Sequence, residues 1–336
     1  MRDLATLPKA HLHLHLEGAM RPTTLRELAD AAGMAVPVIR GFGSFSAFSD
    51  MYVAACDVLQ SDADLRRLID EVVADAAAAG AVWVEPATYV PHHRERLGSD
   101  EHIIELMLDE LTAAGCRHGV GTGLLIAADR TLDPSDAVAQ ARLAVRYAAD
   151  GVVSFGLHND EAGHPPEPFA EAFDIALAGG LLSAPHAGEL DGPSSVVGAV
   201  DRLGAHRIQH GVRAVEDPDL VIQLADLGIC LDVCPTSNVL LSVVPSIEDH
   251  PLPELLAAGV RCSLNADDPL LFGPGLLEEY ELCRTALGLD DAQLADIART
   301  SVEASGAPDA LKVHAAHDID NWMSADAGET AADAVA

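Results

Sequence analysis

Eight short apolar runs, separated by segments with helical patterning, constrain the fold of this chain more than any other feature. The runs are mostly continuous rather than alternating, which is typical of parallel strands buried on both faces. They are Ala10–Leu16, Ala81–Tyr89, Val120–Ala127, Gly151–Leu157, Leu181–His186, Arg207–Val212, Ile229–Cys234 and Arg261–Asn265. Eight β-then-α units predict an α/β fold, a TIM (β/α)8 barrel.

The segment between the first two runs is long for a connection, at roughly 60 residues. It contains two helical patterns, Thr24–Ala32 and Asp62–Ala79. Between these patterns stand Phe42, Phe45, Phe48, Met51 and Tyr52. Spacing near i, i+3 favours the core of an extra helix. We therefore expect a helical insert after strand 1, and the alternative is that some of these side chains form an apolar lid over a pocket.

We see no domain boundary within residues 1–323, and the 336-residue chain is long enough for one barrel with a full core. Residues 324–336 are small and acidic, so we expect a disordered tail there. The formal net charge of −33 argues against nucleic-acid and anionic-membrane partners, which bind through Lys and Arg. It is also compatible with a plainly acidic, soluble surface.

The start of the chain lacks a basic segment followed by an apolar run, so we expect no signal peptide. No stretch reaches the roughly 18 consecutive apolar residues of a membrane helix. The six cysteines contain no CxxC pair and are too few for a disulfide scaffold. We expect reduced core thiols and a cytoplasmic location.

The candidate chemistry stands where the predicted strands end, because functional residues of such barrels collect at the C-terminal ends of the strands. His13 and His15 are two residues apart in the first run, so both face the barrel mouth. His186 ends the fifth run, and Asp267 follows the eighth, which neighbours the first in a closed barrel. Three imidazoles and one carboxylate suit zinc, although an HxH pair alone is a weak signal.

Further titratable groups stand beside this set, and each has a plainer interpretation. Glu189 lies three residues after His186, where it suits a general acid or base, or a carboxylate at a helix N-terminus. Asp268 follows Asp267, so its side chain points in a different direction. It either faces the molecule bound beside the metal or caps the N-terminus of the next helix. His210, taken alone, is most simply a core histidine. Together on one rim, these residues favour an active site.

Eleven residues from Pro8 to Gly18 and four shorter motifs resemble the adenosine deaminase family of metal-dependent hydrolases. The shorter motifs are His186-Ala187-Gly188-Glu189, His210-Gly211, Cys234-Pro235-Thr236-Ser237-Asn238 and Ser263-Leu264-Asn265-Ala266-Asp267-Asp268-Pro269. They run in the family's order from residue 8 to residue 269. Only Lys9 and Lys312 are lysines, and neither stands where a lysine bridges two metals in related barrels. The resemblance therefore implies one metal per chain.

The resemblance implies that one zinc ion is held by His13, His15, His186 and Asp267. It implies that the zinc activates a water molecule, which attacks C6 of a 6-aminopurine. The catalytic residues would be Glu189, His210 and Asp268. Glu189 would protonate ring nitrogen N1, His210 would orient or deprotonate the water, and Asp268 would hold the base near N7 and the attacking oxygen.

The implied substrate contacts are His15, Glu17, Gly18, Asn159 and Asp268, and several depart from the family pattern. Glu17 stands where an Asp usually touches the ribose 5′-hydroxyl, and Asn159 replaces a glycine whose N–H meets purine N3. Gln209 replaces the glycine before His210, and Val84–Tyr89 lacks the usual Arg-Tyr-Ser-Pro run. The residues around the sugar are therefore not standard.

The predicted reaction is deamination of adenosine and 2′-deoxyadenosine to inosine and 2′-deoxyinosine plus ammonia. The alternatives are 6-amino-6-deoxyfutalosine deaminase on a menaquinone route, and adenine deaminase, whose members also carry Glu after the HxH pair. A barrel that binds nucleosides without turnover is an alternative of a different class. The chain lacks the HxE and PCxxC signature of deaminases that act on nucleic-acid bases. We therefore expect a small purine nucleoside as the partner.

Overall fold

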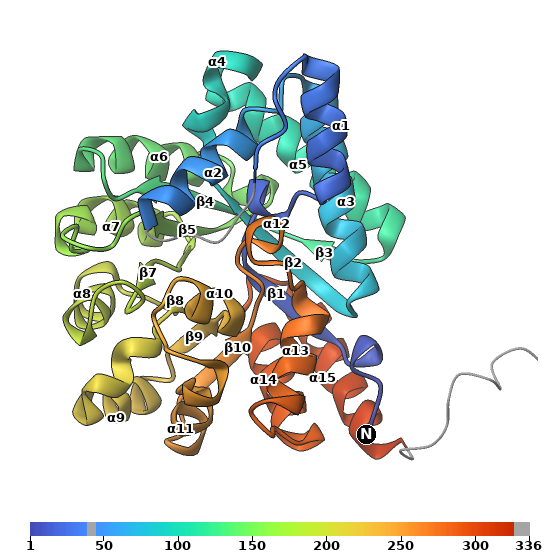
Figure 1. Ribbon diagram of the computed structural model, residues 1–336. Coiled ribbons are helices and arrows are strands. Elements are labelled where there is room, and N and C mark those ends of the chain that lie inside the picture. Colours follow the sequence, from blue (N-terminus) through green and yellow to red (C-terminus); the bar gives the residue numbers. More distant parts are fainter. Residues whose placement is uncertain (39–44, 326–336) are drawn as a thin grey trace, which may run out of the picture.

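The computed structural model describes residues 1–38 and 45–325, and parallel strands in it form a barrel surrounded by helices (Figure 1). Phe42 of the insert and residues 326–336 of the predicted tail lie outside the described residues. The strands are β1 (Lys9–His15), β2 (Ala81–Thr88), β3 (Gly121–Thr122), β4 (Leu124–Asp129), β5 (Val152–His158), β6 (Leu182–Ser183), β7 (His186–Ala187), β8 (Arg207–His210), β9 (Cys230–Val233) and β10 (Arg261–Leu264). The barrel predicted from the eight apolar runs is confirmed.

Two parallel sheets meet to close this barrel. One has the strand order β1-β2-β4-β5-β6, with β3 paired to β2, and the other has the order β10-β9-β8-β7. At one seam the His15 N–H donates to the Asp267 carbonyl at 3.0 Å, and the Asp267 N–H donates to the His13 carbonyl at 3.1 Å. At the other seam the fifth run breaks at Pro185, which has no N–H to donate. Its carbonyl accepts the Gln209 N–H at 3.0 Å.

The barrel interior contains a buried charge network below the rim. Arg207 donates to Glu85 at 2.7 Å, and its Nε lies 3.2 Å from an Asp232 carboxylate oxygen. All three side chains are fully buried, so each charge depends on its partners. Ser263 donates a further hydrogen bond to Asp232 at 2.7 Å. Strand β9 is thereby held in register beneath the site.

Helices surround the strands, and most of them lie in an outer ring (Figure 1). They are α1 (Pro22–Ala32), α2 (Phe45–Cys56), α3 (Asp62–Ala78), α4 (Arg94–Leu97), α5 (Asp100–His118), α6 (Pro134–Arg146), α7 (Ala170–Ala178), α8 (Pro193–Leu203), α9 (Pro218–Leu227), α10 (Pro235–Leu240), α11 (Leu252–Ala257), α12 (Pro269–Phe272), α13 (Leu276–Thr285), α14 (Asp291–Ala304) and α15 (Asp309–Ser324). Short 3-10 helices are η1 (Leu4–Thr6), η2 (Glu17–Ala19), η3 (Val90–His93), η4 (Ala148–Asp150), η5 (Glu167–Phe169), η6 (Val212–Glu216) and η7 (Ile247–Asp249). In the described ranges, no helix combines the length and apolarity needed to cross a bilayer.

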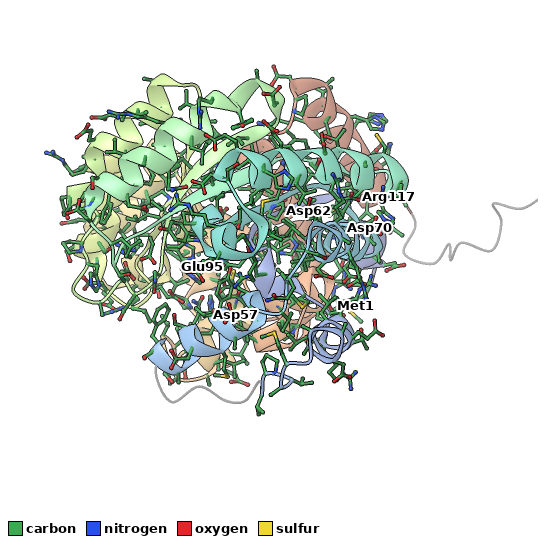
Figure 2. All side chains as sticks on the ribbon, turned by 90° about the horizontal axis from the view of Figure 1, so that it is seen from above. Met1, Asp57, Asp62, Asp70, Glu95 and Arg117 are labelled. Carbon is green, nitrogen blue, oxygen red and sulfur yellow. The ribbon has the colours of Figure 1, made fainter. Side chains whose placement is uncertain are left out.

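Helices α1, α2 and α3 form the insert predicted after strand 1. Helix α3 packs beside α5, and ionic contacts tie the two together at the surface. Arg117 of α5 donates to Asp70 of α3 at 2.7 Å, and both are labelled in Figure 2. Because both side chains are well exposed, this pair contributes little net stability.

Four helices follow the last strand, and the apolar runs did not predict them. Helix α14 packs against β10 and β1, so it covers the seam where the barrel closes. Its start carries a capping box in which Asp290 and Gln293 each bond the other's backbone N–H. Helix α15 packs on α14 but buries only Ala315, Ile319 and Trp322. Such a sparse apolar face gives a weak periodic signal in the sequence.

Candidate active site

Four predicted metal ligands converge at the C-terminal rim of the barrel. They are His13 and His15 at the end of β1, His186 in β7 and Asp267 after β10. Each offers a ligand atom, and these atoms all lie within 4.8 Å of one another. Asp267 Oδ1 is 3.1 Å from His15 Nε2 and 3.3 Å from His13 Nε2. The Nε2 atoms of His13 and His186 are 3.2 Å apart.

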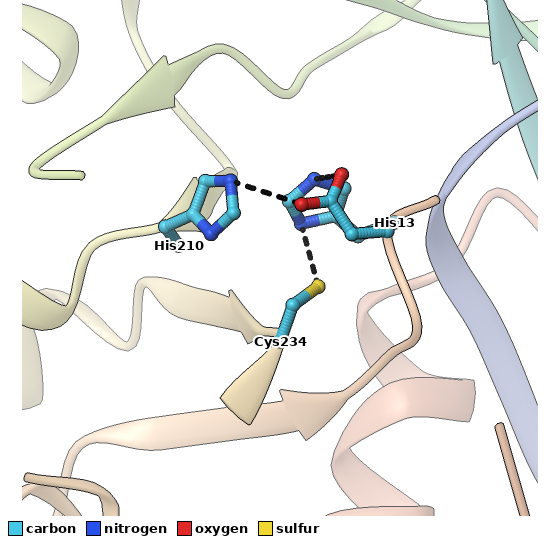
Figure 3. A group of neighbouring side chains, drawn as sticks. His13, His210 and Cys234 are labelled. Atoms are coloured by element: carbon cyan, nitrogen blue, oxygen red, sulfur yellow. Dashed lines mark hydrogen bonds and ion pairs between the residues drawn. The ribbon is translucent and has the colours of Figure 1, made fainter. Parts of the chain in front are cut away.

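The ring of His13 is also held through Nδ1, the nitrogen that faces away from the other predicted ligands. Its Nδ1 lies 2.9 Å from the Asp232 carbonyl and 3.3 Å from Cys234 Sγ (Figure 3). A carbonyl oxygen can only accept, so Nδ1 carries the proton and Nε2 keeps its lone pair for the rim. This outer hydrogen bond is the usual support of a metal-binding histidine.

Asp267 is held in a strained backbone conformation. Its φ is +59°, and His210 (φ +68°) and Asn159 (φ +80°) share the left-handed region. That region is costly for residues other than glycine and recurs at functional sites. The second carboxylate oxygen of Asp267 accepts a hydrogen bond from Ser237 Oγ at 2.6 Å. Its first oxygen is thereby left to the histidines.

The donor chemistry of this set fits zinc. Three imidazole nitrogens and one carboxylate oxygen are the ligands that zinc accepts in catalytic sites. A second possible group is His13, His210, Cys234 and Asp267. It fits less well because Cys234 Sγ lies at Nδ1 of His13, whereas Nε2 of that ring faces His186. The Asp232 carbonyl already occupies this Nδ1.

Glu189 stands on a loop that another buried carboxylate organises. Glu161 Oε1 accepts the N–H of Gly188 at 2.6 Å, and its Oε2 accepts the N–H of Glu189 at 2.9 Å. The same Oε2 accepts the N–H groups of Leu190 and Asp191, at 2.7 and 2.9 Å. Four consecutive amides around one anion form a nest. The backbone that presents Glu189 is thus fixed.

The surroundings of Glu189 favour a neutral carboxyl group. Burial, followed by the charges of Asp267 and Glu161, raises the pKa of Glu189 well above its usual range. One oxygen of Glu189 lies 3.3 Å from His210 Nε2. A carboxyl group that keeps its proton near neutrality is suited to general-acid chemistry.

Asp268 lies at the same rim and fits closely against Gly18. A Cβ added at Gly18 would stand 1.7 Å from Asp268 Oδ1, so only glycine leaves room for this carboxyl group. Burial and the charge of Asp267 raise the pKa of Asp268 well above its usual value. Asp268 Oδ1 has no hydrogen-bond partner among the described residues, so it remains available to a ligand.

A cavity of about 750 Å3, including its open mouth, lies over these groups. Its lining includes His15, His186, Glu189, His210, Asp267 and Asp268 on the rim side, and Phe45, Phe48, Tyr52 and Val53 from α2. Phe48 stacks on Phe272 of α12, with ring centroids 5.3 Å apart. The insert therefore supplies an apolar wall to the cavity. This agrees with the alternative prediction that some of its side chains form a lid over a pocket.

Glu17 and Asn159, two of the substrate contacts that the resemblance implies, have different surroundings. Glu17 is fully buried and is not among the residues that line the cavity. Its carboxylate accepts hydrogen bonds from Tyr52 at 2.6 Å and Thr88 at 2.8 Å, and it pairs with His93 at 2.6 Å. Asn159 does line the cavity, and its side-chain amide donates to Asp129 at 2.8 Å.

Several residues of the site were not assigned roles from the sequence. His158 and Glu161 lie on either side of Asn159, just after the fourth apolar run. His158 packs between the rings of His15 and His186, at centroid distances of 4.6 and 4.7 Å. Asn238 closes the Cys-Pro-Thr-Ser-Asn motif and contacts His210 at 3.1 Å. Asn238 also contacts His250, which belongs to none of the motifs identified in the sequence.

A parallel barrel with such a rim defines a class, the metal-dependent hydrolases of amidohydrolase type. The family model described as adenosine deaminase matches residues 8–322. The chain belongs to the adenosine deaminase family, and it is a hydrolytic purine deaminase.

Known relatives cover nearly the whole chain. A Streptomyces coelicolor protein with the provisional name adenosine/adenine deaminase is 45% identical, over 96% of this chain and 98% of its own length. An adenine deaminase of Chelativorans is 38% identical, over 89% of this chain and 94% of its own. The crystal structure of an adenine deaminase from Arthrobacter aurescens superposes with a TM-score of 0.88 at 31% identity. That match covers 95% of this chain and 99% of the other.

Proposed function

We propose that this protein catalyses the zinc-dependent hydrolytic deamination of the 6-amino group of a purine. The observation that carries the proposal is the convergence of His13, His15, His186 and Asp267 beside Glu189, where all of these residues except His13 line one cavity. Zinc, when bound there, supplies an acidified water near neutral pH. The chain's own residues then activate the purine ring and hold the attacking oxygen.

Glu189 is proposed to donate its proton to ring nitrogen N1, which makes C6 electrophilic. Its raised pKa keeps that proton available near neutral pH. His210, 3.3 Å from Glu189, faces the oxygen that attacks C6. Asp268 is proposed to accept a hydrogen bond from the base or the attacking oxygen through its unpartnered Oδ1. Water and the aminopurine give the 6-oxopurine and ammonia.

We propose the free base adenine as the preferred substrate, ahead of the adenosine and 2′-deoxyadenosine predicted from the sequence. The resemblance placed Glu17 against a ribose 5′-hydroxyl, but three protein groups occupy this carboxylate. Tyr52 lines the cavity and its hydroxyl donates to Glu17, which does not line it. Glu17 is therefore not available to bind the 5′-hydroxyl of a nucleoside. Free adenine has no ribose and needs no such contact. Relatives and a solved structure named as adenine deaminases agree with this choice.

A substrate panel tests both parts of the proposal. The purified enzyme is assayed with adenine, adenosine, 2′-deoxyadenosine, 6-amino-6-deoxyfutalosine and methylthioadenosine, and kcat/KM is compared. We expect ammonia release from adenine with at least about tenfold higher kcat/KM than from any nucleoside. A preference for adenosine would overturn the base assignment alone. Binding of purines with no ammonia release from any of them would instead support a non-catalytic nucleoside-binding barrel.

A further inference from the structure

A line of buried hydrogen bonds leads from the start of α11 to His210 at the rim. The Leu252 N–H donates to His250 Nδ1 at 3.1 Å, and His250 Nε2 lies 3.2 Å from Asn238 Oδ1. Asn238 Nδ2 lies 3.1 Å from His210 Nδ1. The side chains of His250, Asn238 and His210 are all buried. Water therefore does not replace these bonds, and each donor needs its acceptor.

The hydrogen bond from the Leu252 N–H determines which atoms donate and which accept in the rest of this line. A backbone N–H can only donate, so His250 Nδ1 is an acceptor and carries no proton. Burial lowers the pKa of His250 to about 4, so the ring is neutral near pH 7. A neutral imidazole with a bare Nδ1 has its one proton on Nε2. His250 therefore donates to Asn238.

The proton on His250 Nε2 also fixes the orientation of the Asn238 amide. Its Oδ1 must accept the His250 proton, since a reversed amide would set two N–H groups face to face in a buried site. Its Nδ2 then faces His210 and can only donate. His210 Nδ1 is consequently an acceptor. An Nδ1 that accepts a hydrogen bond carries no proton, so the ring proton of His210 lies on Nε2.

We propose that His250 and Asn238 are positioning residues that hold His210 as the tautomer protonated on Nε2. His210 Nε2 points to the rim, where it lies 3.3 Å from Glu189 Oε1. It also lies 3.9 Å from Asp267 Oδ2, a contact that Figure 3 marks with a dashed line. In this tautomer His210 donates a hydrogen bond and has no free lone pair at the rim. It orients the attacking oxygen and does not remove its proton. The role rests on the proposed function, but the tautomer itself does not.

The tautomer is measurable without catalysis. In the zinc-loaded enzyme labelled with 15N-histidine, long-range 1H–15N spectra distinguish the two neutral forms of each ring. Signals are assigned by their disappearance in His210→Gln and His250→Gln. We expect the Nε2-protonated pattern for both rings at pH 7. A proton on Nδ1 of either ring overturns the proposal, even if the enzyme proves inactive on every purine.

Substitutions at Asn238 and His250 test the consequence for turnover. Asn238→Asp keeps an acceptor for His250 but places an acceptor against His210 Nδ1, which draws the proton to Nδ1. We expect kcat to fall at least about tenfold, with KM and zinc content within about twofold. Unchanged kcat would contradict the proposal, and so would a wild-type tautomer pattern in this variant.

A pair of variants at His250 separates positioning from packing. His250→Gln can still accept from Leu252 and donate to Asn238, whereas His250→Leu can do neither. We expect the Leu variant to lose at least about fivefold in kcat and the Gln variant to recover most of that loss. Equal losses in the two variants would assign His250 a packing role and overturn the proposal. His206 serves as the control, because its Nδ1 accepts a backbone N–H from Ser183 away from the rim, so His206→Leu should leave kcat unchanged.

Discussion

The carboxylate of Glu161 accepts the backbone N–H of Glu189 at 2.9 Å, so one buried acid holds the loop that carries another. The two acids differ in their surroundings. Glu161 is satisfied by four amides, whereas Glu189 faces Asp267 and the cavity. Burial beside like charges raises the pKa of Glu189 and favours a neutral carboxyl group there. The pair therefore combines a side chain that fixes the loop through four backbone amides with an acid that keeps its proton.

Replacing Glu189 should lower turnover without changing zinc binding or stability. Glu189→Gln keeps the size of the side chain but removes the acidic proton. We expect turnover to fall at least about 100-fold, because a general acid contributes about 10²–10⁴-fold. Zinc content and thermal midpoint should stay near wild type. The control is Glu171→Gln on the exposed face of α7. Near-normal turnover of Glu189→Gln would refute the acid role.

Replacing Glu161 should weaken both the fold and the reaction. Glu161→Gln sets an amide group against four N–H donors, and a lost hydrogen bond to a charged group costs about 1.5–3 kcal/mol. We expect the free energy of unfolding to drop by about 2–4 kcal/mol, on the same principle. At temperatures where the variant is folded, kcat should fall more than KM rises. Urea unfolding and steady-state kinetics measure the two effects, and a variant like wild type in both would disprove the loop-holding role.

Metal removal should cost both activity and stability. A chelator is expected to abolish deamination and to lower the thermal midpoint, because an ion bound only by the folded state stabilises it. Added zinc should restore both. Asp267→Ala should contain far less than one zinc per chain by elemental analysis. Cys234→Ala should keep the full zinc content, since its thiol is not a proposed ligand. Loss of zinc in the cysteine variant would favour the alternative ligand group.

Burial of Glu279 in α13 predicts that the stability of the folded chain falls as pH rises. Glu279 is almost fully buried, and burial raises its pKa to about 8 from a reference value of 4.5. The unfolded chain ionises this group above about pH 4.5, whereas the folded chain resists ionisation until about pH 8. The folded state is therefore progressively penalised as pH rises between these values.

Glu279→Gln should remove that penalty. We expect its free energy of unfolding to exceed that of wild type by about 1–3 kcal/mol at pH 7, because one pKa unit corresponds to about 1.4 kcal/mol. The difference should shrink toward zero as the pH falls to 4.5. Urea unfolding at pH 7 and pH 5 measures it. An equal difference at both pH values would show that ionisation of Glu279 is not the cause.

Local patterns were enough to predict the barrel and its rim. Continuous apolar runs identify strands buried on both faces, and the spacing of His13 and His15 sets both rings on one side of β1. The order of the runs also places Asp267 beside the first strand once the barrel closes. Helix α15 escaped this reasoning because its buried apolar face is sparse and consists of Ala315, Ile319 and Trp322.

By itself, the sequence determined the alternation of strands and helices, and the residue types available at the rim. The tertiary structure alone decided how the polar groups pair. Glu161 meets amides 27 to 30 residues away, and Glu17 meets His93, which is 76 residues away. Such pairings depend on the angles at which loops leave different strands, which no local periodicity encodes. The same limit applies to the line from His250 to His210, where burial and one backbone N–H decide which atom carries the proton.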